Sequence, residues 1–246
     1  MNLAEVTRHF PDRHILWHKS LPTTMTEASR LATNGCPHGT VVGAESQTAG
    51  QGRLGRTWYS EPGAGLYISI VLRLPFPAVA FPSLTMAIGL AAREAILDST
   101  GITCDLRWPN DLLLGERKCG GILVAVETRV VIAGIGINVN HTGFREDLAD
   151  TANSLRIASG SEHSRESLLI HLLPYVDRWC ETLSEKGVQP ILEAFESASS
   201  YVRNRRVVLD SGERGITAGL DETGFLLLRR DNGEVVKILA GGVRPV

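Results

Sequence analysis

The stretch E-S-Q-T-A-G-Q-G-R-L-G-R-T-W-Y-S, residues 45–60, decides the fold class, because Gly50, Gly52 and Gly55 form a G-x-G-x-x-G pattern within it. In a dinucleotide-binding fold, this pattern ends a strand and opens a helix whose N-terminal amides face a pyrophosphate. Here a proline and two glycines within residues 62–65 interrupt the chain before a helix could form. The pattern therefore predicts a flexible loop between two strands.

A second observation also excludes a parallel doubly wound sheet. The apolar segments 121–127 and 130–138 are typical of strands, and only Thr128 and Arg129 separate them. Such a short link joins antiparallel strands, whereas parallel neighbours need a long crossover connection. We therefore expect a mixed, largely antiparallel sheet.

The remaining patterns place helices around this sheet. Thr24 followed by Glu27 is a capping-box pattern, which predicts a helix with Thr24 at its N-cap that ends near Gly35. Pro174 is expected to bend the helix that contains it. The other predicted strands cover residues 15–18, 39–45, 66–72 and 106–108, and the other predicted helices cover residues 82–100, 164–185 and 190–199.

The last part of the chain changes character. Apolar segments at residues 207–209, 216–220, 224–228 and 235–239 alternate with turn sequences rich in Asp, Asn and Gly. This pattern predicts a small all-β barrel. We therefore expect an α+β protein with two domains, residues 1–199 with the mixed sheet and its packed helices, and residues 200–246 with the barrel.

The composition excludes several classes of protein. A formal net charge of −2 provides no field that would attract nucleic acid or an anionic membrane. The four cysteines form no C-x-x-C pair, which argues against a zinc site and a disulfide framework. No apolar run is long enough to span a bilayer, and the start lacks the apolar region of a signal peptide. We expect a cytoplasmic protein.

Polar clusters at three further places interrupt apolar segments, at residues 107–111 (R-W-P-N-D), 117–121 (R-K-C-G-G) and 134–138 (G-I-G-I-N). Each places side-chain donors or glycine backbone at the end of a strand, where ligand sites tend to be built. Arg53 and Arg56, which lie among the loop glycines, favour a cationic loop that closes on an anion.

Four of these segments together resemble biotin protein ligases. They are Q-T-A-G-Q-G-R-L-G-R-T-W (47–58), W-P-N-D (108–111), K-C-G-G-I (118–122) and G-I-G-I-N (134–138), in the family's order and separations. Thr-Thr-Met at residues 23–25 stands where the family has its biotin segment. The resemblance covers most of the chain and implies the class II synthetase-like fold of biotin and lipoate ligases, with an SH3-like C-terminal barrel.

The resemblance implies a two-step reaction. The biotin carboxylate attacks the α-phosphorus of ATP to give biotinyl-5′-AMP and pyrophosphate, and a carrier-protein lysine then attacks the mixed anhydride. Neither step needs a protein nucleophile, so Arg and Lys donors with Mg²⁺ suffice to position the anions and stabilise charge. The implied partner is a biotin carboxyl carrier protein of acetyl-CoA carboxylase or a related carboxylase. A homodimer is left open.

The family's residue roles carry over to the matched positions. Lys118 and Arg53 are the implied catalytic residues, and Lys118 should reach both the biotin carboxylate and the α-phosphate. No residue is assigned as a metal ligand, and Asp111 is left between a metal contact and a carrier-lysine contact. The implied biotin-binding residues are Thr23, Thr24, Met25, Gln47, Gly50, Gln51, Gly52, Arg53, Lys118 and Gly121, and the nucleotide-binding residues are Arg53, Arg56, Trp58, Asn110, Lys118 and Asn138.

Two positions depart from the family pattern. Gln51 stands where many members have arginine, so the loop lacks one charge, and residues 241–244 only loosely match a Gly-Gly element followed by a basic residue. Among the tryptophans, Trp58 is favoured for the nucleotide site, whereas Trp108 is expected in the core. Cys119 is expected to fill buried space.

Three other functions are weighed against the ligase. A lipoate ligase or lipoyl transferase would share the architecture but lack the loop that contains Arg53. A biotin-responsive repressor would carry an N-terminal DNA-binding module, and too little chain precedes Thr23 for one. A binding protein without catalysis would be expected to lose Lys118 or Arg53. We therefore predict a monofunctional ligase.

Overall fold

The computed structural model describes residues 1–74, 81–127 and 130–246. The predicted two-residue link at 128–129 lies outside the described residues. Within these ranges, no helix combines the length and the apolar character that a membrane span requires.

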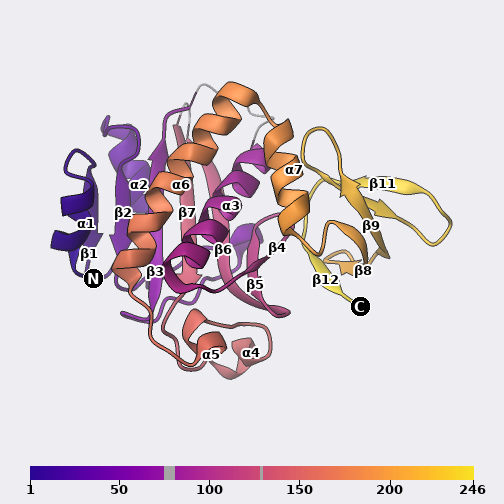
Figure 1. Ribbon diagram of the computed structural model, residues 1–246, viewed down its shortest axis with the longest axis horizontal. Helices are drawn as coiled ribbons and strands as arrows, with labels where there is room; N and C mark the ends of the chain where they lie inside the picture. The colour runs from indigo at the N-terminus through magenta and orange to yellow at the C-terminus, as the bar shows by residue number, and fades with distance from the viewer. Residues whose placement is uncertain (75–80, 128–129) are drawn as a thin grey trace.

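A seven-stranded mixed sheet forms the centre of the molecule, in the order β1-β2-β3-β7-β6-β5-β4 (Figure 1). β1 and β2 pair in parallel, and the other neighbours are antiparallel, which confirms the predicted sheet. The strands are β1 (Ile15–His18), β2 (Val41–Ala44), β3 (Gly65–Leu72), β4 (Asp105–Arg107), β5 (Asp111–Leu114), β6 (Arg117–Glu127) and β7 (Val130–Asn138).

Helices cover both faces of this sheet. Side chains of β3 alternate between the faces, so Ile70 belongs to one apolar cluster and Val71 to the other. The cluster of Ile70 packs beneath α3 (Phe81–Thr100) and α6 (Arg165–Lys186), whereas that of Val71 packs against α2 (Thr24–Thr33). The remaining helices are α1 (Leu3–His9), α4 (Glu146–Ala149), α5 (Leu155–Ser159), α7 (Gln189–Ala198) and the 3₁₀ turn η1 (Arg53–Gly55).

The predicted N-cap of α2 is wrong by one residue. Thr23 is the cap: its backbone is extended, and its hydroxyl accepts a hydrogen bond from the Met25 amide at 3.3 Å. Thr24 cannot serve as the cap because it is already helical, and its hydroxyl contacts Ser69 at 2.8 Å. Thr23 therefore caps the helix, whereas the Thr24 side chain faces the sheet.

Several helices and strands were not predicted from the sequence. β5 follows Trp108 too closely to stand out as a separate apolar segment, and α1, α4 and α5 are short. Trp108 and Cys119 are buried in the core, as expected.

The C-terminal part is a second, five-stranded antiparallel sheet in the order β11-β10-β9-β8-β12. Its side chains join the cluster beneath α3, and Trp108 Nε1 donates a hydrogen bond to the Gly224 carbonyl at 3.0 Å. The division into domains at residue 199 stays a prediction. The strands are β8 (Arg203–Leu209), β9 (Arg214–Leu220), β10 (Leu226–Arg229), β11 (Val235–Ile238) and β12 (Val243–Pro245).

Candidate active site

Two adjoining cavities lie where the loop of residues 45–60, here called the ligand loop, crosses strands β6 and β7. The inner cavity has a volume of about 40 Å³ and the outer one about 590 Å³. Both are lined by Gly52, Arg53, Trp58, Asn110 and Lys118, so these residues stand between the two spaces.

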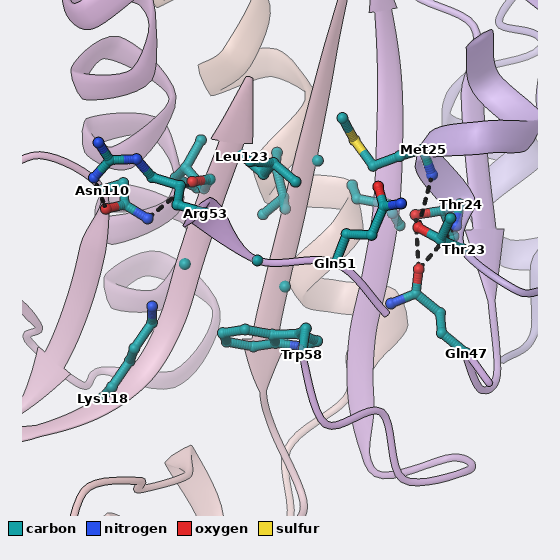
Figure 2. A pocket seen from close by; sticks show the side chains of 17 residues that line it. Thr23, Thr24, Met25, Gln47, Gln51, Arg53, Trp58, Asn110, Lys118 and Leu123 are labelled. Carbon is teal, nitrogen blue, oxygen red and sulfur yellow. Dashed lines mark hydrogen bonds between the residues drawn. The ribbon is translucent and has the colours of Figure 1, made fainter. Parts of the chain in front are cut away.

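One end of the inner cavity is neutral and rich in hydrogen-bonding groups (Figure 2). Gln47 Oε1 accepts a hydrogen bond from the Thr24 amide at 2.8 Å, and Gln47 Nε2 donates to Ser60 Oγ at 3.0 Å. These contacts fix the orientation of the Gln47 amide. Because Thr23 lines the same end, the site presents both hydroxyl and amide groups to a polar, uncharged ligand.

The floor of the inner cavity is made of strand glycines. Gly121 of β6 pairs with Gly136 of β7, and a Cβ on Gly136 would lie 2.6 Å from Trp58 Cε2. A Cβ on Gly134 would lie 2.6 Å from Met25 Sδ. These glycines let an indole and a thioether lie flat on the sheet. Gly134 and Gly136 lie in the segment 134–138 that the sequence marks as a place for a ligand site, but neither was predicted as a binding residue, although alternate glycines within a strand signal close approach of a ligand or another group.

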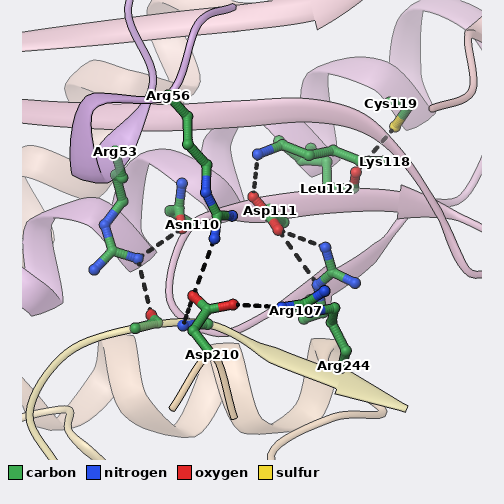
Figure 3. Close-up of polar contacts among 12 residues, drawn as sticks. Arg53, Arg56, Arg107, Asn110, Asp111, Leu112, Lys118, Cys119, Asp210 and Arg244 are labelled. Carbon is green, nitrogen blue, oxygen red and sulfur yellow. Dashed lines mark hydrogen bonds and ion pairs between the residues drawn. The ribbon is translucent and has the colours of Figure 1, made fainter. Parts of the chain in front are cut away.

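The other end of the inner cavity is cationic. Lys118 forms an ion pair with Asp111, and Arg107 Nη2 donates to the other oxygen of that carboxylate at 2.7 Å (Figure 3). Burial would raise the pKa of Asp111, but Lys118 and Arg107 outweigh it and hold the pKa below its usual range. Lys118 Nζ also lies 5.4 Å from the centre of the Trp58 ring. An ionised Asp111 thus fixes the position of Lys118.

Arg53 reaches from the ligand loop across the mouth of the inner cavity. Its Nη1 donates to Asn110 Oδ1 at 3.0 Å and to the Gly241 carbonyl at 3.2 Å. Asn110 in turn donates to the Ile122 carbonyl at 3.0 Å. Desolvation lowers the pKa of Arg53 from its usual value, and the guanidinium stays charged at neutral pH.

Nearly all of the predicted site residues line these cavities. Gly50 does not; its carbonyl accepts a hydrogen bond from the Trp58 amide at 2.8 Å, and a Cβ there would lie 2.4 Å from the Trp58 carbonyl. It therefore shapes the ligand loop. Thr23, Thr24, Met25, Gln47, Gln51, Gly52, Arg53, Trp58, Asn110, Lys118 and Gly121 line the inner cavity, and Arg56 and Asn138 line only the outer one.

The outer cavity carries an excess of positive charge. Six basic and four acidic side chains line it, and its wall includes Asp210 and residues 241, 242, 244 and 245 of the C-terminal sheet. Sequence reasoning missed Asp210, which lies in an ordinary Asp-Ser-Gly turn. In the described part of the chain, no three His, Cys, Asp or Glu side chains gather closely enough to hold a metal ion.

Comparison with known families decides the relationship. The model of the biotin/lipoate A/B protein ligase family matches residues 17–141, which include the inner cavity. The chain belongs to this family. The outer-cavity residues Asp210 and Arg244 lie beyond the matched region.

Individual relatives extend the match over most of the chain. The bifunctional ligase/repressor BirA of Bacillus subtilis is 36% identical over 230 residues, which is 90% of this chain and 71% of the relative. The biotin--[acetyl-CoA-carboxylase] ligase of Mycobacterium tuberculosis is 31% identical over 87% of this chain and 82% of its own. The structure of biotin protein ligase from Aquifex aeolicus in complex with biotin and ATP matches with a TM-score of 0.83 at 30% identity, covering 94% of this chain and 97% of that one.

Proposed function

We propose that this chain is a biotin protein ligase, which activates biotin with ATP and transfers the biotinyl group to a lysine of a carrier protein. One observation carries the proposal: a cavity with a neutral polar end, a glycine floor and a cationic end opens into a second, positively charged cavity. The uncharged head, apolar body and carboxylate of biotin would lie in this order along the inner cavity. The polyphosphate of ATP would follow in the outer cavity.

Biotin fits the inner cavity by chemistry. Its ureido group has one acceptor and two N–H donors, which the hydroxyl and amide groups of Thr23, Thr24 and Gln47 complement. Its apolar ring and chain would lie beside Met25 and Trp58, which cover the glycine floor, and its carboxylate would meet Lys118 and Arg53. A volume of about 40 Å³ has room only for a few waters. Entry of biotin therefore requires residues around the cavity to move apart.

The nucleotide fits the outer cavity, whose volume lies in the usual range for ligand sites. Arg56 would meet phosphate oxygens, and Trp58 offers an aromatic face for the adenine. We assign no protein cage to Mg²⁺, because Asp111 is already paired with two cations. The ion would arrive bound to the phosphates of ATP and keep several of its waters.

The residues act by positioning and charge. In the first step, a biotin carboxylate oxygen attacks the α-phosphorus, and the bond to the bridging oxygen breaks as pyrophosphate leaves. Lys118 and Arg53 offset the repulsion between the two anions. In the second step, the carrier amine attacks the acyl carbon, loses a proton and displaces AMP. Because its pKa is lowered, Asp111 is a poor base, so its role is to hold Lys118.

As the carrier, we propose a biotin carboxyl carrier protein of acetyl-CoA carboxylase or a related carboxylase, because two relatives are named as biotin--[acetyl-CoA-carboxylase] ligases. A homodimer and a cytoplasmic location stay predictions.

The test is a pyrophosphate-release assay with MgATP that offers biotin, lipoate and octanoate in turn, with and without a biotin carrier domain. We expect release that depends on biotin, with label on the carrier lysine. Activity with lipoate alone would make the chain a lipoate ligase, and no release with any acid would refute the proposal.

A further inference from the structure

A carboxylate of the C-terminal sheet contacts the ligand loop (Figure 3). Asp210 Oδ2 lies 3.4 Å from Arg56 Nη2 and accepts a hydrogen bond from the Gly242 amide at 2.9 Å. Asp210 Oδ1 accepts a hydrogen bond from Arg244 Nη2 at 3.0 Å. One side chain therefore joins a guanidinium of the ligand loop to one of β12 at the wall of the outer cavity.

The same turn also reaches Arg53. The Asp210 amide donates to the Gly242 carbonyl at 3.2 Å, so backbone and side chain of Asp210 both fix this turn. The neighbouring Gly241 carbonyl then accepts the hydrogen bond from Arg53. Asp210 is thus linked directly to Arg56 and, through residues 241–242, to Arg53.

This arrangement has little value for stability alone. The side chains of Arg56 and Arg244 are 68% and 62% exposed, and ion pairs with such partners contribute little to folding. The effect of these ion pairs is to fix the orientation of the Arg56 and Arg244 side chains. Arg56 follows a glycine turn in which Leu54 has the left-handed φ of 57°, and a free arginine there would lose considerable entropy on meeting a ligand.

Ionisation of Asp210 persists at neutral pH. Burial would raise its pKa, but Arg56, Arg244 and the Gly242 amide outweigh burial and lower the pKa from its usual value. Each guanidinium has five N–H donors, so binding Asp210 leaves donors for an entering phosphate.

We propose that Asp210 is a positioning residue that holds Arg56 and Arg244 at the wall of the outer cavity and thereby strengthens binding of the nucleotide polyphosphate. The inference rests on the proposed function, since it takes the polyphosphate to be that of ATP. It assigns a task in the reaction to a residue that does not touch the reacting atoms.

The test compares Asp210→Asn with wild type in full-length protein. The variant keeps an acceptor for the Gly242 amide but loses the ionic hold on both arginines. We expect the KM for ATP to rise about tenfold, equivalent to about 1.4 kcal/mol, with the KM for biotin and the melting temperature unchanged. Asp210→Glu should recover part of the loss. The matched control is Asp231→Asn, which breaks an Asp–Arg pair with Arg206 in the same sheet.

A second readout separates positioning from a general structural role. If Asp210 acts through Arg56 and Arg244, then Asp210→Asn should add little to the KM effect of the double variant Arg56→Gln/Arg244→Gln. Additive effects would overturn the inference. A fall in the KM for ATP would also overturn it, because Asp210 would then be competing with phosphate for the arginines. If wild type releases no pyrophosphate with biotin, the proposed function fails instead; direct ATP binding then decides the inference, which an unchanged affinity in Asp210→Asn would refute.

Discussion

At Lys118, an internal carboxylate and an entering anion would share one ammonium group. Asp111 holds Lys118 in place, and Arg107 keeps that carboxylate ionised and aligned. Because the ammonium group is already aligned, less entropy is lost when the biotin carboxylate binds it, which lowers the cost of the first chemical step.

Replacement of Lys118 by Gln should lower kcat/KM for biotin-dependent pyrophosphate release by about 10²–10³-fold, the cost of removing one preorganised donor. Folding should survive because Asp111 keeps its partner Arg107. Steady-state kinetics and thermal melting of Lys118→Gln and Lys118→Arg measure both effects. An activity of Lys118→Gln within a few-fold of wild type would contradict the catalytic role.

Burial of His141 makes the free energy of unfolding depend on pH. Its ring is fully buried, Nε2 lies 3.2 Å from Tyr67 Oη, and Nδ1 has no hydrogen-bond partner among the described residues. Burial lowers its pKa from 6.5 to about 4. The unfolded chain therefore binds more protons between these values, so stability is fully present above pH 6.5 and falls as pH drops toward 4.

Urea unfolding at pH 7 and pH 5 should show this loss in wild type, up to an upper limit of roughly 3 kcal/mol for the full shift. His141→Gln should reduce the difference between the two pH values. The matched control is His9→Gln, which removes an exposed imidazole instead of a buried one. An equal pH dependence in wild type and His141→Gln would refute this assignment.

Local sequence motifs were enough to predict most residues of the site, but not Asp210 at the wall of the outer cavity. Arg53 and Lys118 are conspicuous because each lies beside glycines that a plain loop does not require. Asp210 gives no such signal, since Asp in a tight turn is ordinary and its role arises only from contact with a distant loop. Gly50 was assigned to biotin, yet its visible task is to shape the ligand loop.

At the scale of elements, the antiparallel pair β6–β7 determines the site. The short spacing between two apolar segments was sufficient to predict this pair and to exclude a parallel fold. β5 could not be predicted in the same way, because its pairing with β4 and β6 is a tertiary contact. The helix cap was displaced by one residue because Ser69 and Gln47, both remote in sequence, engage Thr24.

The glycine floor leads to a prediction for β7. Gly136→Ala would place a methyl group 2.6 Å from Trp58 and force the indole off the floor. Biotin-dependent activity should fall at least about tenfold, with a stability loss of about 1–3 kcal/mol from overpacking. Gly43→Ala is the control, because its Cβ would lie 2.0 Å from Trp17 Cζ3, in a contact between β1 and β2 outside the cavities. Equal loss of activity in both variants would refute a special role for the floor.

At the scale of the whole molecule, the two sheets share one apolar core. Tyr201, Val207 and Leu226 belong to the same buried cluster as Met86 of α3, and Trp108 donates its hydrogen bond to the C-terminal sheet. Composition and turn chemistry predicted a separate C-terminal barrel. A shared core is not visible in sequence, because the apolar residues of both parts look alike.

Equilibrium urea unfolding should therefore show one cooperative transition. Tryptophan fluorescence and far-UV circular dichroism should give coincident curves, although all four tryptophans, Trp17, Trp58, Trp108 and Trp179, precede the C-terminal sheet. Removal of the bond to Gly224 in Trp108→Phe should shift both curves together. Two separated transitions would indicate that the parts fold independently.

The outer cavity is assembled from segments that leave the ribosome at different times. The ligand loop, β6 and β7 are synthesised first, whereas Asp210 and residues 241–245 come after every other residue that lines the cavity. Because the two sheets share one apolar core, the glycine floor and the wall that contacts Arg56 should form in the same folding transition. Under the proposed function, the nucleotide site is therefore complete only once residues 241–245 have been synthesised and have packed against the ligand loop.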